Sequence, residues 1–352
     1  MKYVTVTDAW HPQVNGVVRT IEATNRELER AGHTTHVIAP ADFASVPCPG
    51  YREIRLALLP YRRLQRLLDR TLDATDDVAV HIATEGPLGH AARRYCIRRR
   101  IPFTTAYHTR FPQYLHAMFR VPERWTYAFL RRFHGAAACL MAPTPTVERE
   151  LRANGLGNVE LWTRGVDTDM FRPHPAAAEQ TGRPRFLYVG RVSVEKNIQA
   201  FLQLDLPGTK VVAGVGPALE PLRRRFPEAH FVGVMDHTSL ARLYSSADVF
   251  VFPSRTDTFG LVMLEALACG TPVAAYPVQG PLDVVGGSAA AILDDDLRTA
   301  ALQALRLDRR ACRAHAELHS WRQATAQFAG HQIPVRATRI GKDTTASASA
   351  GG

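Results

Sequence analysis

Long apolar runs are absent from this sequence of 352 residues: no stretch of 18 apolar residues exists, so the sequence predicts no transmembrane helix. Residues 1–7 alternate apolar and polar side chains and lack the cationic start and apolar core of a secretory signal peptide. The five cysteines are far apart and form no CxxC or Cys/His pattern, which argues against a zinc site or a disulfide framework. We expect a cytoplasmic protein whose cysteines are small core residues.

Acidic side chains are fewer than basic ones, 33 against 43, which leaves a formal net charge of +10. Such a charge attracts polyanions, whether nucleic acid, anionic lipid or phosphorylated substrates. Arginines recur at helical spacing in two N-terminal stretches, residues 62–70 and 93–100. Beside Leu64, Leu67 and Leu68, the first set predicts a basic amphipathic helix on a membrane interface, with a solvated basic face as the alternative. No pattern of a nucleic-acid-binding module accompanies these arginines, so nucleic acid is not an expected partner.

The order of predicted elements is that of an α/β protein with two doubly wound, Rossmann-like domains. β-rich stretches alternate with helical ones through the first half, and the alternation restarts at residue 185 and continues to residue 276. A stretch rich in proline and alanine separates the two halves. We predict an N-terminal domain over residues 1–170, a linker over 171–184, a C-terminal domain over 185–333 and a disordered tail over 334–352. Ligands bind at the C-terminal ends of parallel strands, so the active site is expected in a cleft where the two domains face each other.

The most informative stretch is residues 249–270, in which a buried strand runs into a polar loop holding Asp257 and then into a helix. The helix start exposes the amides of Phe259, Gly260 and Leu261, and such a start is a ready anion site. Glu265 stands among apolar residues of this helix, where a carboxylate needs a hydrogen-bonding partner. Its helical face points back toward the loop, so hydroxyls of a sugar or ribose would satisfy it, with an ion pair to Arg255 as the alternative.

With these residues the sequence resembles the retaining glycosyltransferases of family 4, also called group 1, which have the two-domain GT-B fold. The spacing from Asp257 to Glu265 is similar to the family's acidic pair, although the first member here is Asp in place of the usual Glu. Residues 190–197 resemble the family loop whose two cations, here Arg191 and Lys196, hold the donor diphosphate. Fixed cations stabilise the charge of a leaving diphosphate, so neither a metal nor another cofactor is expected.

The resemblance implies further contacts with the donor. Residues 12–17 resemble the loop in which a glycine amide, here Gly16, approaches the donor phosphates. His108 follows a predicted strand at the point where a family histidine touches the transferred sugar, so His108 and Asp257 are the expected catalytic residues. The segment around Met235 is similar in position to the one that contacts the nucleobase through its backbone.

Three other patterns receive structural interpretations. Asp167-Thr168-Asp169 superficially matches a metal-binding Asp-x-Asp motif, but it lies in a stretch that resembles a structural loop of the family. The acidic residues 294–296 more simply cap a helix. Residues 214–217 lack the third glycine of a dinucleotide fingerprint and predict a tight turn that lines the donor site.

The resemblance implies a metal-independent hexosyltransferase that acts with retention and takes its sugar from UDP-hexose, UDP-hexuronic acid or GDP-mannose. Residues 7–20 and the loop with Asp257 look closest to bacterial lipid glycosyltransferases and alpha-mannosyltransferases. With the basic helices, they favour a lipid or glycan acceptor and an anionic membrane surface, here the inner face of the cell membrane. The alternatives are a nucleotide-sugar epimerase of the same architecture and a non-enzymatic protein that binds polyanions through its basic surface.

Overall fold

The computed structural model describes residues 1–13, 15–48, 51–73, 77–110, 112–113, 120–174 and 184–335. The chain divides into two compact units. Unit 1 comprises Met1–Thr163 with the segment that begins at Ala324, and unit 2 comprises Arg164–Gln323. Each unit contains a six-stranded sheet in which every pair of neighbouring strands is parallel. The prediction of two doubly wound α/β domains is confirmed.

The central strands of the unit 1 sheet are buried on both faces. Its strands, in sheet order, are β2 (Thr34–Ile38), β1 (Lys2–Val6), β5 (Val78–Ile82), β6 (Phe103–Ala106), β7 (Cys139–Ala142) and β8 (Val159–Leu161). Successive side chains of a strand point to opposite faces. Val4 therefore packs in one core cluster with Leu64 and Leu88, and Tyr3 packs in another with Leu28 and Phe328.

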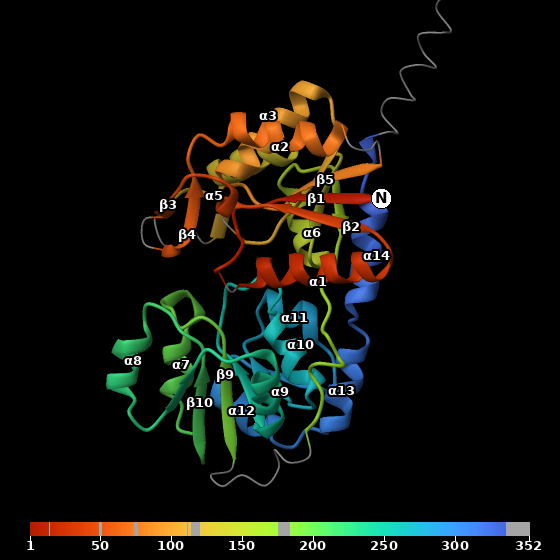
Figure 1. Cartoon of the computed structure of the whole chain (residues 1–352). Helices are drawn as coiled ribbons and strands as arrows, with labels where there is room; N and C mark the ends of the chain where they lie inside the picture. The colour runs from red at the N-terminus through yellow and green to blue at the C-terminus, as the bar shows by residue number, and fades with distance from the viewer. Residues whose placement is uncertain are drawn as a thin grey trace, which may run out of the picture. The chain divides into compact units, whose positions relative to one another are not determined.

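Helices supply the other half of each core cluster in unit 1. They are α1 (Gly16–Arg30), α2 (Tyr61–Asp73), α3 (Pro87–Arg99), α5 (Glu123–His134), α6 (Pro145–Ala153) and most of α14 (Trp321–His331). Figure 1 shows α2 and α3 together on one side of the sheet and α1 on the other. An antiparallel pair, β3 (Ser45–Cys48) and β4 (Tyr51–Ala57), follows the short helix η1 (Pro40–Asp42) and was not predicted.

Unit 2 repeats the arrangement. Its strands, in sheet order, are β11 (His230–Gly233), β10 (Thr209–Ala213), β9 (Arg185–Val189), β12 (Val249–Phe252), β13 (Val273–Ala275) and β14 (Ala291–Leu293). Its helices are η3 (Val194–Lys196), α7 (Ile198–Leu202), α8 (Leu219–Arg225), α9 (His237–Ser246), α10 (Leu261–Ala268), α11 (Gln279–Val285), α12 (Leu297–Ala304) and α13 (Arg309–Glu317). One core cluster joins α9, α10 and α13 to the sheet, and the other joins α7, α8 and α12 to the opposite face.

The unit boundaries differ from the predicted domain boundaries. Residues 171–174 were assigned to the linker, but Phe171 is buried in the core of unit 2 and the amide of His174 donates to the Ser245 hydroxyl at 3.2 Å. Residues 175–183, the rest of that linker, lie outside the described residues. The second domain was expected to extend to residue 333, but Phe328 packs against Tyr3 and Trp162 of unit 1. Of the predicted tail, residues 336–352 lie outside the described part.

The predicted basic helix exists as α2, but its leucines do not face a membrane. Leu64 and Leu68 are fully buried in the core of unit 1, and Leu67 packs partly against it. The helix therefore presents its arginines outward, as in the alternative of a basic face. None of the helices that the structure describes is long and apolar enough to cross a membrane.

The cysteines are free thiols. Cys96, Cys139, Cys269 and Cys312 are buried, which confirms them as small core residues, and Cys48 is half-buried. Burial raises the pKa of the Cys96 thiol to about 12, so this side chain stays a neutral apolar group at physiological pH.

Candidate functional site in unit 2

Two glycine loops pack against each other where β9 and β10 end. Gly190 and Gly214 have φ angles of 149° and 135°, a region that side-chain-bearing residues rarely adopt. A Cβ atom on Gly214 would lie 1.9 Å from the Gly190 carbonyl oxygen, so the approach requires glycine. The Val192 amide also donates to the Val215 carbonyl at 2.9 Å. The turn lies slightly later than predicted, because the Leu219 amide donates to the Gly216 carbonyl at 3.1 Å, and the glycine contact holds the backbone next to Arg191.

Arg191 and Lys196 both lie on the loop that follows β9. The Arg191 carbonyl accepts a hydrogen bond of 2.7 Å from the Tyr188 hydroxyl, which anchors the loop to the strand below it. Burial, with smaller contributions from Asp257 and Glu195, raises the pKa of Tyr188, so its hydroxyl stays a donor. Lys196 ends the short helix η3 and forms an ion pair with Asp257 on the next loop of the sheet.

The ion pair belongs to a wider set of links between the loops after β9 and β12. The Asn197 amide group, on a residue with φ of 53°, donates to the Pro253 carbonyl at 3.1 Å. The Thr256 hydroxyl donates to the Glu195 carbonyl at 3.5 Å. Lys196 keeps 30% of its side-chain exposure and Asp257 keeps 17%, so the pair is partly open to solvent. Asp257 Oδ2 is buried and has no hydrogen-bond partner among the described residues.

The helix α10 begins with amides that no side chain caps. Its N-cap residue is Gly260, whose φ of 89° requires glycine, and which has no side chain to bond the first amides. The helix ends in a Schellman motif, in which the Gly270 amide donates to Leu267 and the Thr271 amide donates to Ala266. Phe259, which precedes the N-cap residue, is 9% exposed, and its side chain packs in the core. The start of this helix therefore has backbone amides without a side-chain cap, as an anion site requires, and anion binding there stays a prediction.

Glu265 is buried in α10, with 6% of its surface exposed. Its Oε2 accepts a hydrogen bond of 3.0 Å from the Tyr244 hydroxyl of α9. The alternative pairing with Arg255 does not occur: the Arg255 guanidinium lies over the ring of Tyr276, 3.7 Å from its centroid. Sequence reasoning missed Tyr244, because its contact with Glu265 links two helices and follows no local spacing.

The other predicted residues of unit 2 lie at the same edge of the sheet. Met235 follows β11, is half-buried and packs against the core beside the exposed Val234. The neighbouring Asp236 caps α9 through the Ser239 amide at 2.9 Å.

Two acidic motifs have the structural roles expected of them. The Asp167 carboxylate accepts the amides of Asp169 and Met170 at 3.2 and 2.9 Å and so stabilises a loop. Asp296 accepts the Arg298 amide at 3.0 Å and caps α12.

In unit 1, Gly16 and His108 also lie where strands end. Gly16 opens α1 after the N-cap Asn15, which accepts the amides of Val17 and Val18 at 3.0 Å. A Cβ atom on Gly16 would meet nothing within 4 Å, so packing within the described residues does not require glycine there. His108 follows β6, is half-buried, and its ring lies edge-on to Trp162 at 5.9 Å.

Two family models match the chain. The model described as Glycosyltransferase Family 4 matches residues 14–170, and the model described as Glycosyl transferases group 1 matches residues 183–307. A GDP-mannose-dependent alpha-mannosyltransferase of Mycobacterium tuberculosis is 30% identical over 303 residues, which cover 80% of each chain. The sulfoquinovosyl transferase SQD2 of Arabidopsis thaliana is 28% identical over 347 residues, which cover 85% of this chain and 66% of that one. An alpha-monoglucosyldiacylglycerol synthase of Streptococcus pneumoniae is 29% identical over 313 residues, which cover 77% and 70%.

Solved structures share the fold at lower identity. The sucrose-phosphate synthase of Thermosynechococcus elongatus superposes with a TM-score of 0.71 at 22% identity, covering 98% of this chain and 99% of that one. The Anabaena protein Alr3699/HepE, in complex with UDP and glucose, superposes with a TM-score of 0.69 at 15% identity and coverages of 94% and 98%. At these identities the likeness establishes the fold of the two units.

Proposed function

The chain is a member of glycosyltransferase family 4 and has its GT-B fold, and from this premise we propose that it transfers a hexose-type sugar, with retention, from a nucleotide diphosphate sugar to a lipid or glycolipid acceptor. One observation carries the proposal. The loops after β9 and β12 bring Lys196 against Asp257, beside a helix start whose amides have no side-chain cap. Cations, a free carboxylate oxygen and open amides together suit a diphosphate joined to a sugar.

In the proposed complex, Arg191 and Lys196 hold the diphosphate without a metal. The diphosphate gains negative charge as its bond to the sugar breaks, so fixed cations stabilise the transition state more than the bound substrate and lower the barrier. The amides of Phe259, Gly260 and Leu261 add hydrogen-bond donors at the same anion.

The transferred sugar would meet acceptors of hydrogen bonds. The unpaired Oδ2 of Asp257 and the carboxylate of Glu265, which Tyr244 orients, would accept sugar or ribose hydroxyls. From unit 1 we assign the Gly16 amide to the donor phosphates and His108 to the transferred sugar, as in the family pattern. The backbone around Met235 would contact the nucleobase.

The proposed chemistry is a front-face displacement. The bond between the anomeric carbon and the phosphate oxygen breaks, and the acceptor oxygen bonds to the same face of that carbon. The acceptor proton passes to the departing phosphate oxygen. The sugar stays open among UDP-hexose, UDP-hexuronic acid and GDP-mannose, since the relatives' names include mannosyl, glucosyl and sulfoquinovosyl transfer.

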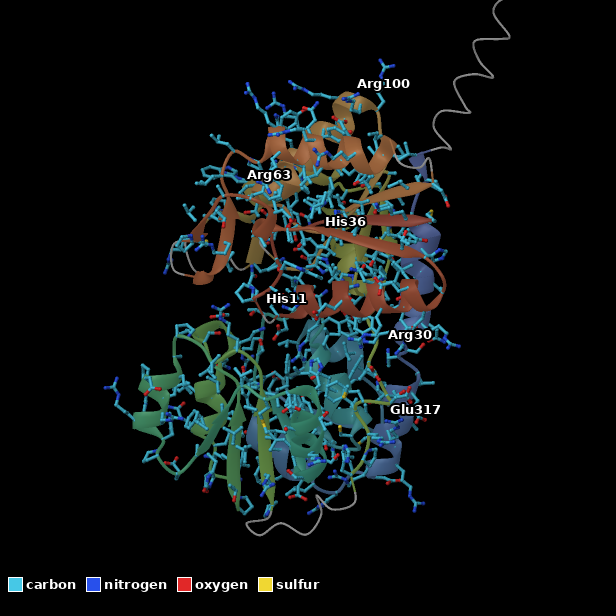
Figure 2. All side chains as sticks on the ribbon, in the orientation of Figure 1. His11, Arg30, His36, Arg63, Arg100 and Glu317 are labelled. Atoms are coloured by element: carbon cyan, nitrogen blue, oxygen red, sulfur yellow. The ribbon has the colours of Figure 1, made fainter. Side chains whose placement is uncertain are left out.

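The basic outer surface of α2 and α3 supports an acceptor at a membrane. Its exposed arginines are Arg62, Arg63, Arg66, Arg70, Arg94, Arg98, Arg99 and Arg100. Figure 2 shows Arg100 extending from the ribbon on the same side of unit 1 as Arg63. Leu59 is 96% exposed where α2 begins, and Ile97 of α3 and Trp125 of α5 are also exposed. Each basic residue near an anionic membrane contributes about 1 kcal/mol, so we propose peripheral binding at the inner face of the cell membrane.

The proposed donor site is tested by thermal unfolding and donor hydrolysis with UDP-glucose, UDP-glucuronate and GDP-mannose. We expect one donor to raise the melting temperature of the wild type, and Lys196→Ala and Glu265→Gln to abolish that rise. Arg306→Ala, which removes an exposed cation elsewhere in unit 2, should leave it unchanged. Indifference of the wild type to every donor would contradict the proposal and favour the polyanion-binding alternative.

A further inference from the structure

Arg255 is a cation that the proposed donor chemistry does not use. It is exposed on the loop after β12, and its guanidinium lies 3.7 Å from the centroid of the Tyr276 ring. Among the residues that the structure describes, no carboxylate forms an ion pair with it. By contrast, Arg223, Arg298 and Arg313, which also lie in unit 2, each pair with an acidic side chain.

Arg255 lies close in the sequence to Asp257, the residue to which the proposal assigns a sugar hydroxyl. It precedes Asp257 by two residues on the same loop, and Tyr276 directly follows β13, the neighbouring strand. The segment after Tyr276 packs against the loop, because a Cβ atom on Gly280 would lie 2.8 Å from the Asp257 carbonyl oxygen. The stacked pair therefore lies on the same edge of the sheet as Lys196 and Asp257.

The local charges leave Arg255 free to bind an anion. Asp257, the nearest carboxylate along the loop, forms its ion pair with Lys196 through Oδ1 and forms none with Arg255. Stacking on Tyr276 uses the face of the guanidinium and leaves its N–H edges to donate in the plane. A planar guanidinium held in this way can donate two parallel hydrogen bonds to two oxygens of a carboxylate or a sulfonate. Because the Tyr276 ring already restricts the rotamers of Arg255, ligand binding removes less conformational entropy from this side chain.

We propose that Arg255, oriented by Tyr276, recognises a carboxylate or sulfonate group on a sugar. The anionic sugar is either the one transferred or the one that accepts it. This inference rests on the proposed function and adds to it the charge of one sugar substrate.

The test compares neutral and charged sugars in two arms. The donor arm measures dissociation constants of wild type, Arg255→Ala and Arg255→Lys for two pairs, UDP-glucose with UDP-glucuronate and GDP-mannose with GDP-mannuronate. The acceptor arm measures KM for glucosyl and glucuronosyl diacylglycerol in mixed micelles, with the donor that binds. Arg306→Ala is the matched control, because it removes an exposed arginine of unit 2 away from this loop.

We expect the wild type and Arg306→Ala to prefer the charged sugar by about tenfold or more in one arm, as for a charge-assisted hydrogen-bonded pair. Arg255→Ala should remove that preference, and Arg255→Lys should keep part of it. The arm in which the preference falls identifies the source of the anion. Equal values for charged and neutral sugars in both arms, or a preference that survives Arg255→Ala, would overturn the inference while nucleotide-sugar binding persists. If no nucleotide sugar binds the wild type, the proposed function fails and the inference fails with it.

Discussion

Units 1 and 2 share one fold class but use the charged groups at their strand ends differently. In unit 1, Asp8 accepts the Thr84 hydroxyl and the amides of Leu88 and Gly89 at 2.9 to 3.3 Å. In unit 2, one oxygen of Asp257 has no partner among the described residues.

Other groups at the two edges follow the same contrast. In unit 1, Glu150 is held by Arg110, Tyr127 and Gln113 at 2.5 to 2.7 Å, which ties down the loop that carries His108. In unit 2, Arg255 rests on an aromatic ring. Glu150 of unit 1 therefore holds a loop, whereas Arg255 of unit 2 contacts an aromatic ring and pairs with no carboxylate among the described residues.

The largest effect is expected from removing the ion pair between Lys196 and Asp257 of unit 2. Lys196→Ala should lower kcat for glycosyl transfer roughly 10²- to 10³-fold, the range for removing one fixed group that stabilises developing negative charge. Steady-state kinetics with the donor that stabilises the wild type measure it. Arg306→Ala should change kcat less than twofold, and a Lys196→Ala enzyme with wild-type kcat would remove the diphosphate role of this lysine.

The glycine contact that supports this link is the next target. Gly214→Ala places a methyl group on the Gly190 carbonyl and forces a left-handed φ, so it should destabilise unit 2 by roughly 2 to 4 kcal/mol. Gly287→Ala also has a positive φ, of 72°, but meets nothing within 4 Å, and about 1 kcal/mol is expected. Urea unfolding of both variants separates the two causes. Equal losses would show that packing of the two glycine loops contributes nothing.

The basic surface of unit 1 gives a smaller effect. The double variant Arg63→Glu/Arg66→Glu should weaken binding to vesicles of anionic lipid by about tenfold or more, at about 1 kcal/mol for each cation lost. Arg223→Glu/Arg224→Glu makes the same change in charge on α8 of unit 2 and is the control. Vesicle sedimentation with zwitterionic lipid should show no binding by any form. Equal loss in both double variants would mean that net charge acts in place of this surface.

The smallest expected effects are on the pH dependence of folding stability, and they have opposite signs for one carboxylate in each unit. Burial is the main cause of a raised pKa for Asp8, so its contribution to stability falls as pH rises from 3.8 through that raised pKa. Hydrogen bonds from Ser239 lower the pKa of Asp236, so its contribution is present above 3.8 and lost as pH falls through the lowered pKa.

The variants Asp8→Asn and Asp236→Asn make this difference measurable. With rising pH, the gap in melting temperature between wild type and Asp8→Asn should shrink, while the gap for Asp236→Asn should widen. Thermal unfolding between about pH 3 and 6 covers both ranges. Parallel curves for the two variants would show that the carboxylates do not differ in environment.

Much of the fold could be predicted because its periodic patterns are local. The alternation predicted from residue 185 to residue 276 is present from β9, which begins at Arg185, to β13, which ends at Ala275, since a strand buried on both faces is a short apolar run between turn residues. Lys196 and Asp257 were both predicted to contact the donor, but the ion pair between them was not predicted. Gly260 marked the helix start because no other residue readily takes its φ.

Contacts between distant segments could not be predicted in this way. Tyr244 contacts Glu265 between two helices, and Arg255 contacts Tyr276 between the ends of two strands. The spacing of residues within one element therefore predicts neither contact. The return of the chain at Ala324 to unit 1 depends on Phe328 fitting a cluster built from other strands. The leucines of α2 matched a membrane helix and a core helix equally well, and burial decided between them.

The central claim is that a nucleotide sugar binds over Lys196, and the chain allows a direct test because it has four lysines, Lys2, Lys196, Lys210 and Lys342. Modification by an amine-reactive reagent can be followed at each lysine by mass spectrometry, with and without a nucleotide sugar that stabilises the protein. We predict that the saturating ligand slows modification of Lys196 and leaves the rates at Lys2 and Lys210 unchanged. Modification of Lys196 at the same rate with and without bound ligand would contradict the claim.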